Sequence, residues 1–287
     1  MSANIGTFGR LGVAASTPAT QFMEYLTLGI KKRTTHAHDE GIRGTRERYF
    51  NRSRIVSSVV SGPIAMQPSI SEIDWWVSRI LGGTTGSGIT LVAETLPSFY
   101  AIWDSGDNVH EWSSCKVDKA TLSGAQGQPL NLTCDIEALT EALNAASFPA
   151  ITAATDSMFV ASDVVLTLGG SAVEVESWNM VIDNMLIKDR FMNSLTRSEL
   201  PESDRIVSFN CVVPYNTTNV GLYSDAIAGI EGVLAITGNS VTYTWTFGQL
   251  LAPKEGPDGP ARSELKLNLN FRAFNDGTLG SVKVVKT

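Results

Sequence analysis

Alternating apolar and polar residues, the pattern of half-buried strands, recur along most of the chain. In the first half this pattern predicts strands over residues 22–30, 55–66, 89–94, 98–103, 109–123 and 130–136. In the second half it predicts strands over residues 164–168, 173–182, 206–213, 241–247, 264–274 and 281–285. Segments 109–123 and 130–136 flank a Gly-Ala-Gln-Gly turn and should pair as a hairpin. The chain is therefore expected to be mainly β.

One helix is predicted with both a start and a stop signal. Ser69 and Glu72 form a capping box, and Gly82-Gly83 supplies the end. Between them, apolar residues recur at helical spacing: Ile73, Trp76, Val77, Ile80 and Leu81. A weaker helix is expected over residues 222–230, and a short one over 137–147.

Two charged segments are too polar to pack in a core and are predicted as long loops. Residues 31–54 hold eight basic and three acidic side chains. Residues 188–204 form the second loop. Each loop follows an apolar segment and precedes an alternating segment that opens with Arg-Ile-Val-Ser, at Arg54 and at Arg205.

Further short matches keep the same order in the two halves. Ile30-Lys31 matches Ile187-Lys188, Tyr100 matches Tyr243, and the run from Leu130 to Thr133 matches the run from Leu267 to Asn270. Conserved order with loops of changing length is typical of a duplicated unit. The expected division is a first domain at 1–140, a linker at 141–157 and a second domain at 158–287. Residues 1–20 would be an extended arm of the first domain, which also carries the basic loop 31–54.

Composition narrows the function classes. The 287 residues are 43% hydrophobic with a formal charge of −7, which suits a folded protein that repels polyanions rather than one that grips phosphates. There is no run of 18 apolar residues and no apolar signal segment, so we expect synthesis in the cytoplasm and no membrane anchor. Cys115, Cys134 and Cys211 are too far apart for a zinc motif and are expected to be buried strand residues.

Candidate chemistry is sparse. His36 and His38 lie on one side of an extended segment and could hold a metal, but they have no further ligand nearby in the sequence. The glycine-rich run at 82–88 lacks the following Lys and helix of a phosphate loop. We therefore expect neither an enzyme nor a cofactor.

The basic segment 31–54 has three interpretations. It could dock on an acidic surface of another copy, since an acidic protein with one basic loop is complementary to itself. It could be a nucleic-acid arm, because Tyr49 and Phe50 lie among arginines. It could also be a solvated loop.

Three stretches carry a resemblance to a known family. They are Lys116-Val117-Asp118 running into Leu130-Asn131-Leu132-Thr133, Ser177 to Ile187 with its charged loop and Arg-Ile-Val-Ser, and the strand from Leu265 to Phe274 after a Pro/Gly loop. Together they resemble the tail tube proteins of long-tailed, siphophage-type bacteriophages. The resemblance implies two tandem β-sandwich or barrel domains, each with a short flanking helix and a long loop.

It also implies a structural virion protein of the phage tail that forms stacked rings around an electronegative channel for DNA ejection. Two domains in one chain imply homotrimeric, pseudo-hexameric rings; without duplication, six chains of one elaborated domain would form the ring. The implied partners are further copies of the chain, a tape-measure protein, double-stranded DNA, a tail terminator and distal tail proteins. The alternatives are a tail terminator, a secretion-system tube, or a nucleic-acid-binding module that uses residues 31–54.

The same resemblance assigns residues to surfaces. The acids expected to face the lumen, with the outer surface as the alternative, are Asp118, Asp135, Glu174, Glu176 and Asp183. The residues expected to contact the next ring are Lys31, Lys32, Arg33, Arg43, Arg46, Arg48, Arg52, Lys188, Asp189, Arg190, Arg197 and Glu199.

Overall fold

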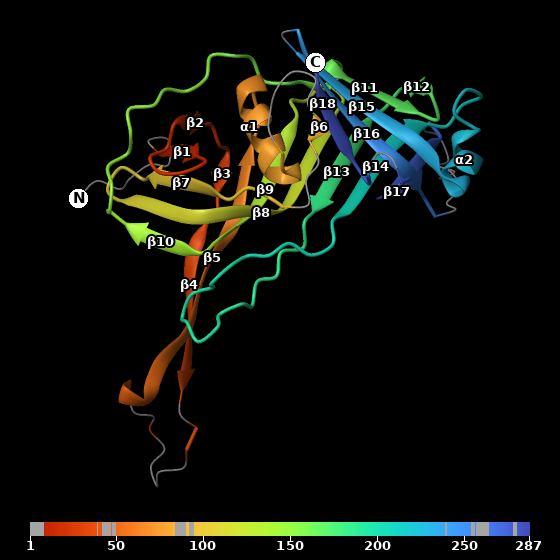
Figure 1. The fold of residues 1–287 in the computed structure, drawn as a ribbon. Coiled ribbons are helices and arrows are strands. Elements are labelled where there is room, and N and C mark those ends of the chain that lie inside the picture. The colour runs from red at the N-terminus through yellow and green to blue at the C-terminus, as the bar shows by residue number, and fades with distance from the viewer. Residues whose placement is uncertain are drawn as a thin grey trace.

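The computed structural model describes residues 9–38, 40–41, 47, 50–83, 90–91, 95–238, 240–253, 256, 264–277 and 280–287. Antiparallel strands make up most of this part, which confirms the expected mainly β fold (Figure 1). The strands of the first half are β1 (Arg10–Ala14), β2 (Gln21–Met23), β3 (Thr27–Leu28), β4 (Lys31–His38), β5 (Ser53–Met66), β6 (Thr90–Leu91), β7 (Phe99–Asp104), β8 (Val109–Ala125), β9 (Asn131–Ala138) and β10 (Thr140–Leu143). Those of the second half are β11 (Val164–Leu168), β12 (Ser171–Val173), β13 (Ser177–Asp183), β14 (Ile206–Pro214), β15 (Ile230–Gly238), β16 (Val241–Leu251), β17 (Lys266–Phe274) and β18 (Lys283–Lys286). The helices are α1 (Ile70–Leu81) and α2 (Leu222–Ala228), with short 3₁₀ turns η2 (Phe50–Arg52) and η3 (Ala161–Asp163).

Helix α1 begins and ends where its capping signals predict. The Ser69 backbone N–H donates to Glu72 Oε2 at 2.9 Å, and the other carboxylate oxygen accepts from Glu24 N at 2.7 Å. The predicted apolar face is buried, with Trp76 wholly inaccessible to solvent. Glu72 therefore joins the helix start to the chain just before β3.

Strand pairing follows the same order twice. In the first half the order is β2-β1-β7-β8-β9-β5-β4, and in the second it is β12-β11-β15-β16-β17-β14-β13. Helix α1 follows β5, and α2 follows β14. A register shift lies at the start of β7, between Phe99 and Ala101, and at the start of β15, between Ile230 and Gly232. We call residues 9–143 the first unit and residues 164–287 the second unit.

The pairing register corrects three of the short sequence matches. Val60 pairs with Ala138 in the first unit, and Val207 pairs with Ala273 in the second. On this register the run at Arg54 lies beyond the end of β9, where β5 pairs only with β4, so it is not the counterpart of the run at Arg205. Side chains along a strand alternate between its two faces, so short runs from two strands can be matched at any even shift in register.

The pairing also corrects the other two matches. Leu132 and Leu267 occupy equivalent places, because they pair with Met66 and Val213. The predicted match of the two Leu-Asn runs is therefore two residues off. Tyr100 lies in β7, whereas Tyr243 lies in β16, the counterpart of β8, so these two tyrosines are not equivalent.

One sheet runs through both units. The second part of β8, from Lys119 to Ala125, pairs with β13 over its whole length, Ser177 to Asp183. The sheet therefore continues as β4-β5-β9-β8-β13-β14-β17, and β18 adds a second junction by pairing with β6. One apolar cluster includes buried residues of both units.

Some expected elements differ in the structure. The helix predicted over residues 137–147 is instead the end of β9 followed by β10, which pairs with the first part of β8. Segment 31–54 is partly strand, because β4 pairs with β5 in a hairpin that projects from the body (Figure 1). Strand β15 was not predicted, since its small residues and Gly weaken the pattern. The cysteines are buried, as expected.

Replacing Phe209 by Ala should lower the free energy of unfolding by about 3–5 kcal/mol. Phe209 is fully buried, and its ring lies 6.3 Å from that of Trp178 and 5.2 Å from that of Phe247. Chemical denaturation measures the loss. Phe50→Ala is the control, because that side chain is 94% exposed and its loss should change stability by less than about 0.5 kcal/mol. Equal effects would contradict this assignment of the core.

Candidate assembly and channel surfaces

The continuous sheet has one buried face and one open polar face. Along β13 and β14, residues alternate between buried and half-buried, and four of the nine half-buried ones are Ser or Asn. A row of short polar side chains crosses five neighbouring strands, because each member pairs directly with the next. The row is Asn131, Ser123, Asn179, Asn210 and Asn270. These residues line a shallow cavity of about 360 Å³.

The amide of Asn179 is incompletely satisfied. Its Oδ1 is buried and has no hydrogen-bond partner within the described part of the chain. A buried polar atom without a partner is costly unless water or a ligand meets it. The middle of the open face is thus uncharged but able to hydrogen-bond.

Two of the predicted lumen acids lie on this open face. Asp135 pairs across strands with Lys119, and Lys119 pairs with Asp183. Burial raises the pKa of the Asp135 carboxyl above its ordinary value, although Lys119 and Lys188 act in the opposite direction. Charges of both signs alternate here, so these two acids do not form a purely negative row.

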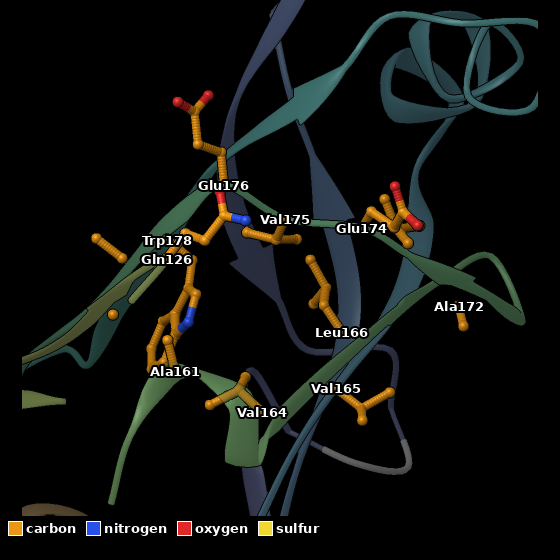
Figure 2. A pocket seen from close by; sticks show the side chains of 13 residues that line it. Gln126, Ala161, Val164, Val165, Leu166, Ala172, Glu174, Val175, Glu176 and Trp178 are labelled. Carbon is orange, nitrogen blue, oxygen red and sulfur yellow. The ribbon is translucent and has the colours of Figure 1, made fainter. Parts of the chain in front are cut away.

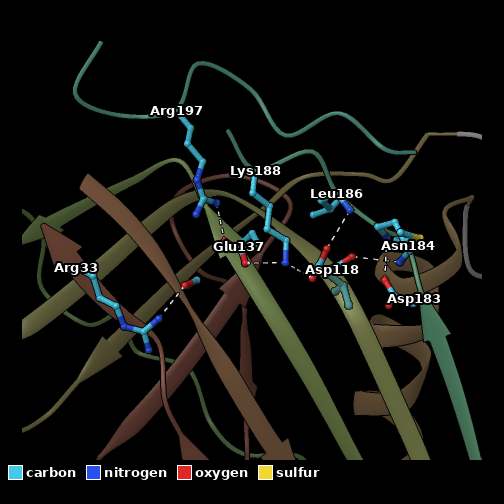
Figure 3. A network of polar contacts seen from close by, with 11 residues as sticks. Arg33, Asp118, Glu137, Asp183, Asn184, Leu186, Lys188 and Arg197 are labelled. Atoms are coloured by element: carbon cyan, nitrogen blue, oxygen red, sulfur yellow. Dashed lines mark hydrogen bonds and ion pairs between the residues drawn. The ribbon is translucent and has the colours of Figure 1, made fainter. Parts of the chain in front are cut away.

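Asp118 is placed differently. It is buried, and Figure 3 shows its carboxylate beneath the connection between β13 and β14. Asp118 Oδ1 accepts from Leu186 N at 3.0 Å, and Oδ2 lies 2.5 Å from Lys188 Nζ. Asp118 thus holds the connection, residues 184–205, on the first unit. It does not lie on the open face.

Arg197 provides the second contact that fixes the connection to the first unit. The Arg197 side chain is 4% exposed and its guanidinium donates to Glu137 Oε2 at 2.6 Å, while Lys188 Nζ lies 3.3 Å from the other oxygen of the same carboxylate (Figure 3). Burial lowers the pKa of Lys188, but Asp118 and Glu137 outweigh it and the net shift is upward. The connection therefore brings two cations to two carboxylates of β8 and β9.

The far part of the connection also contacts the first unit. Lys116 Nζ donates to Leu200 O at 3.0 Å and to Glu202 Oε1 at 2.7 Å, and Ser58 N donates to Leu195 O at 2.7 Å. Leu96, Leu186 and Leu200 form a small apolar cluster beneath it. Lys188 and Arg197, predicted to contact the next ring, thus have their partners in the same chain. Arg190 pairs with Glu199 within the connection, and Asp189 lies beside Arg190.

The sequence did not point to the end of α1 as a contact. Asn184 Nδ2 donates to Ile80 O and to Val117 O, both at 3.1 Å, and Arg205 Nη2 donates to Leu81 O at 3.3 Å. Arg205 Nε also donates to Asn184 Oδ1 at 3.1 Å. The last carbonyls of a helix need such donors, so a search for side chains to satisfy α1 could have suggested them. The second unit supplies both.

The basic hairpin, residues 31–57, is here called the arm. All eight residues of β4 are exposed, including Lys31, Lys32 and Arg33. Arg52 ends η2, next to β5, and Arg43, Arg46 and Arg48 lie outside the described residues. His36 and His38 are exposed on β4, and no group of three or more metal-ligating side chains occurs within the described ranges.

A groove lies between β11, β12 and the start of β13. Figure 2 shows Val164, Leu166 and Val175 around it, with the carboxylates of Glu174 and Glu176 at its rim. Its volume is about 450 Å³, and a neighbouring hollow of about 440 Å³ adds Glu264 and Lys266. Glu176 pairs with Lys266 at 2.5 Å. The two predicted lumen acids Glu174 and Glu176 therefore lie at a groove rim, before β13 begins.

Replacing Arg197 by Met should lower the free energy of unfolding by about 3 kcal/mol, because Glu137 stays buried with a weaker partner. Chemical denaturation at pH 7 measures this. Arg190→Met is the matched control: its pair with Glu199 is exposed, so the loss should stay under about 1 kcal/mol. A loss at Arg197 no larger than that at Arg190 would mean that the connection is not held by this ion pair.

The ion pair of Glu202 should make stability depend on pH in the acid range. Burial raises the pKa of Glu202, but hydrogen bonds from Lys116 and Leu96 N outweigh it, and the net pKa lies below its ordinary value of 4.5. A carboxylate whose pKa is lower in the folded state stabilises the protein at pH values above its unfolded-state pKa. That stabilisation is lost as the pH falls through the folded-state pKa. The stability gap between wild type and Glu202→Gln should thus be full above about pH 5 and shrink below it.

Denaturation curves between pH 7 and pH 3 would measure this gap. Lys116→Met should also reduce the loss of stability on acidification, because it removes the cation that pairs with the Glu202 carboxylate. A gap between wild type and Glu202→Gln that is independent of pH would exclude this ion pair as a source of acid sensitivity.

No helix among the described residues is long and apolar enough to cross a membrane. The family model of the phage tail tube protein matches residues 7–273. A comparison with curated proteins gave no match. The family match agrees with the resemblance found in the sequence and covers almost the whole chain. The chain belongs to the phage tail tube protein family.

Proposed function

We propose that this protein builds the tube of a phage tail as rings of three chains, each ring containing six similar units. The family supports the structural role in the virion tail. The observation that carries the ring is the pairing of β8 with β13, which continues one sheet from unit to unit within the chain. The repeated pairing order of the two units supports their origin as tandem tube domains at about the predicted boundaries.

The same junction can recur between chains. Strand β13 lies between β14 and β8, whereas its counterpart, formed by β3 and β4, pairs only with β5 among the described strands. An open strand edge is a template for another chain. The edge of β3 and β4 thus receives the neighbouring chain, and three such contacts close the continuous sheet into a ring. Six chains in a ring would instead need twelve units.

In this ring the open polar face lines the channel. Its central row is made of Asn and Ser, and its charges of opposite sign neighbour one another at Asp135, Lys119 and Asp183. Such a wall offers DNA few fixed cations, so phosphates pass without strong contacts. The same face surrounds a tape-measure protein before DNA enters, and the tube ends meet the tail terminator and distal tail proteins.

The contacts between rings come from the arm. It is exposed, basic and projects beyond the sheet, while the connection 184–205 is already held by Asp118 and Glu137. This assignment keeps the side chains of Lys31, Lys32 and Arg33 in the contact between rings, while backbone groups of the same strand pair within the ring. It moves Lys188 and Arg197 into the contact between units of one chain.

Proline at the β4 edge tests the ring. Successive N–H groups of a strand point to opposite edges. One of the variants Lys31→Pro and Lys32→Pro therefore removes an N–H group that faces β5, and the other removes an N–H group that faces the open edge. Thermal melting identifies the outward variant as the one that keeps wild-type stability. That variant should lose rings in negative-stain images and sediment as a single chain.

The control is the other proline variant, whose melting temperature should fall because it breaks the β4–β5 ladder. Mass measurement of wild-type rings separates three chains from six. A wild-type protein that stays monomeric and binds DNA in a salt-sensitive way would overturn the tube and favour a nucleic-acid-binding module. Rings formed by both proline variants would overturn only the use of this edge.

A further inference from the structure

The arm carries exposed apolar side chains among its charges. Phe50 is 94% exposed, and Ile55 and Val56 are 43% and 48% exposed. Arg54 lies beside Ile55 and is exposed as well. A side chain as large as Phe50 left almost wholly in water on a projecting hairpin is suited to a contact with another molecule. The partner of the arm must therefore offer an apolar surface near negative charge.

The groove of the second unit has those two properties. Val164, Leu166 and Val175 form its apolar part, and Glu174 and Glu176 lie at its rim (Figure 2). Glu264 adds a third carboxylate in the neighbouring hollow, against the single cation Lys266 among its lining residues. Val175 lies two residues before β13. The equivalent position of the first unit, two residues before β3, holds Tyr25. The OH of Tyr25 accepts a hydrogen bond from Trp103 Nε1 at 2.9 Å.

The arm and the groove lie at opposite ends of the sheet. At one end, Asp183 pairs with Lys119, and the arm continues β5 beyond Val60 on that same side. At the other end, Ser177 pairs with Ala125, next to the groove. Figure 1 shows the arm projecting away from the body, with β11 and β12 on the opposite side. One chain cannot bring its own arm into its own groove, but two chains stacked end to end can.

We propose that Phe50 of one chain inserts into the groove of a second copy in the next ring, with Arg54 against Glu174. This contact rests on the proposed stacking of rings. Each chain has one arm and one such groove, so every contact leaves a free arm and a free groove at the ends of the stack. Contacts of this head-to-tail kind extend without closing. Three contacts between successive rings would hold the tube.

Charge reversal tests the pair. Arg54→Glu and Glu174→Arg should each weaken ring stacking by about tenfold, because attraction becomes repulsion at a desolvated contact. The double variant should regain most of the loss. Glu174 is chosen because Glu176 already pairs with Lys266. Asp107→Arg, an equal charge change in the exposed turn after β7, should leave stacking unchanged.

Sedimentation and negative-stain images separate rings from tubes. The proposal expects single rings from the Arg54 and Glu174 variants and tubes from the double variant. Tubes from both single variants, or no recovery in the double variant, would overturn the contact. An absence of rings in the wild type would instead overturn the proposed function, so the two failures are distinguishable.

A second measurement does not depend on charge. Phe50→Cys combined with Ala172→Cys, at the groove, should form disulfides between chains under mild oxidation of tubes, and none in isolated rings. The natural cysteines are buried and should not compete. Crosslinks absent from intact tubes would overturn the insertion. Loss of DNA retention in Phe50→Ser with tubes unchanged would assign the arm to nucleic acid instead.

Discussion

The pairing of β8 with β13 is the contact on which the rest of the structure depends. Strand β8 is long enough to serve two neighbours in succession: its first part pairs with β7, and its second part, from Lys119 to Ala125, pairs with β13. The bulge between Val117 and Lys119 marks the change. Without this second part the only pairing between named strands of the two units, among the described residues, would be the short β18–β6 pairing. The sheet, and with it a common open face, exists because one strand belongs to both units.

A backbone junction alone allows a strand to slip, and the surrounding side chains fix its register. Asn184 and Arg205 bind the end of α1, and Arg197 reaches Glu137 from the far side of the connection. A buried ion pair is weak evidence for stability, but it is specific, since a shifted β13 would leave Glu137 and Asp118 buried without cations. Hydrophobic burial alone does not distinguish registers that differ by two residues. The ion pairs and hydrogen bonds thus select one of these registers.

The sequence predicted individual helices and strands better than it predicted which strands are equivalent and which side chains are partners. Helix α1 and the β8–β9 hairpin could be read directly, because capping at Ser69 and a tight turn are local signals. The counterpart of Arg54 was misplaced, because a two-residue period repeats at every even shift and only the pairing of Val60 with Ala138 fixes it. Asp118 was expected in a lumen because its partner Lys188 lies 70 residues away in the chain. Long-range partners have no local pattern.

The two units differ where their contacts differ. In the second unit the connection 184–205 folds back on the first unit of the same chain, so its cations meet carboxylates already in place. In the first unit the corresponding segment becomes the arm, whose β4 is fully exposed and whose Phe50 has no apolar cover among the described residues. Joining two units in one chain allows one loop to fix the seam between them and leaves the other exposed, which in the proposed tube frees it for the contact between rings.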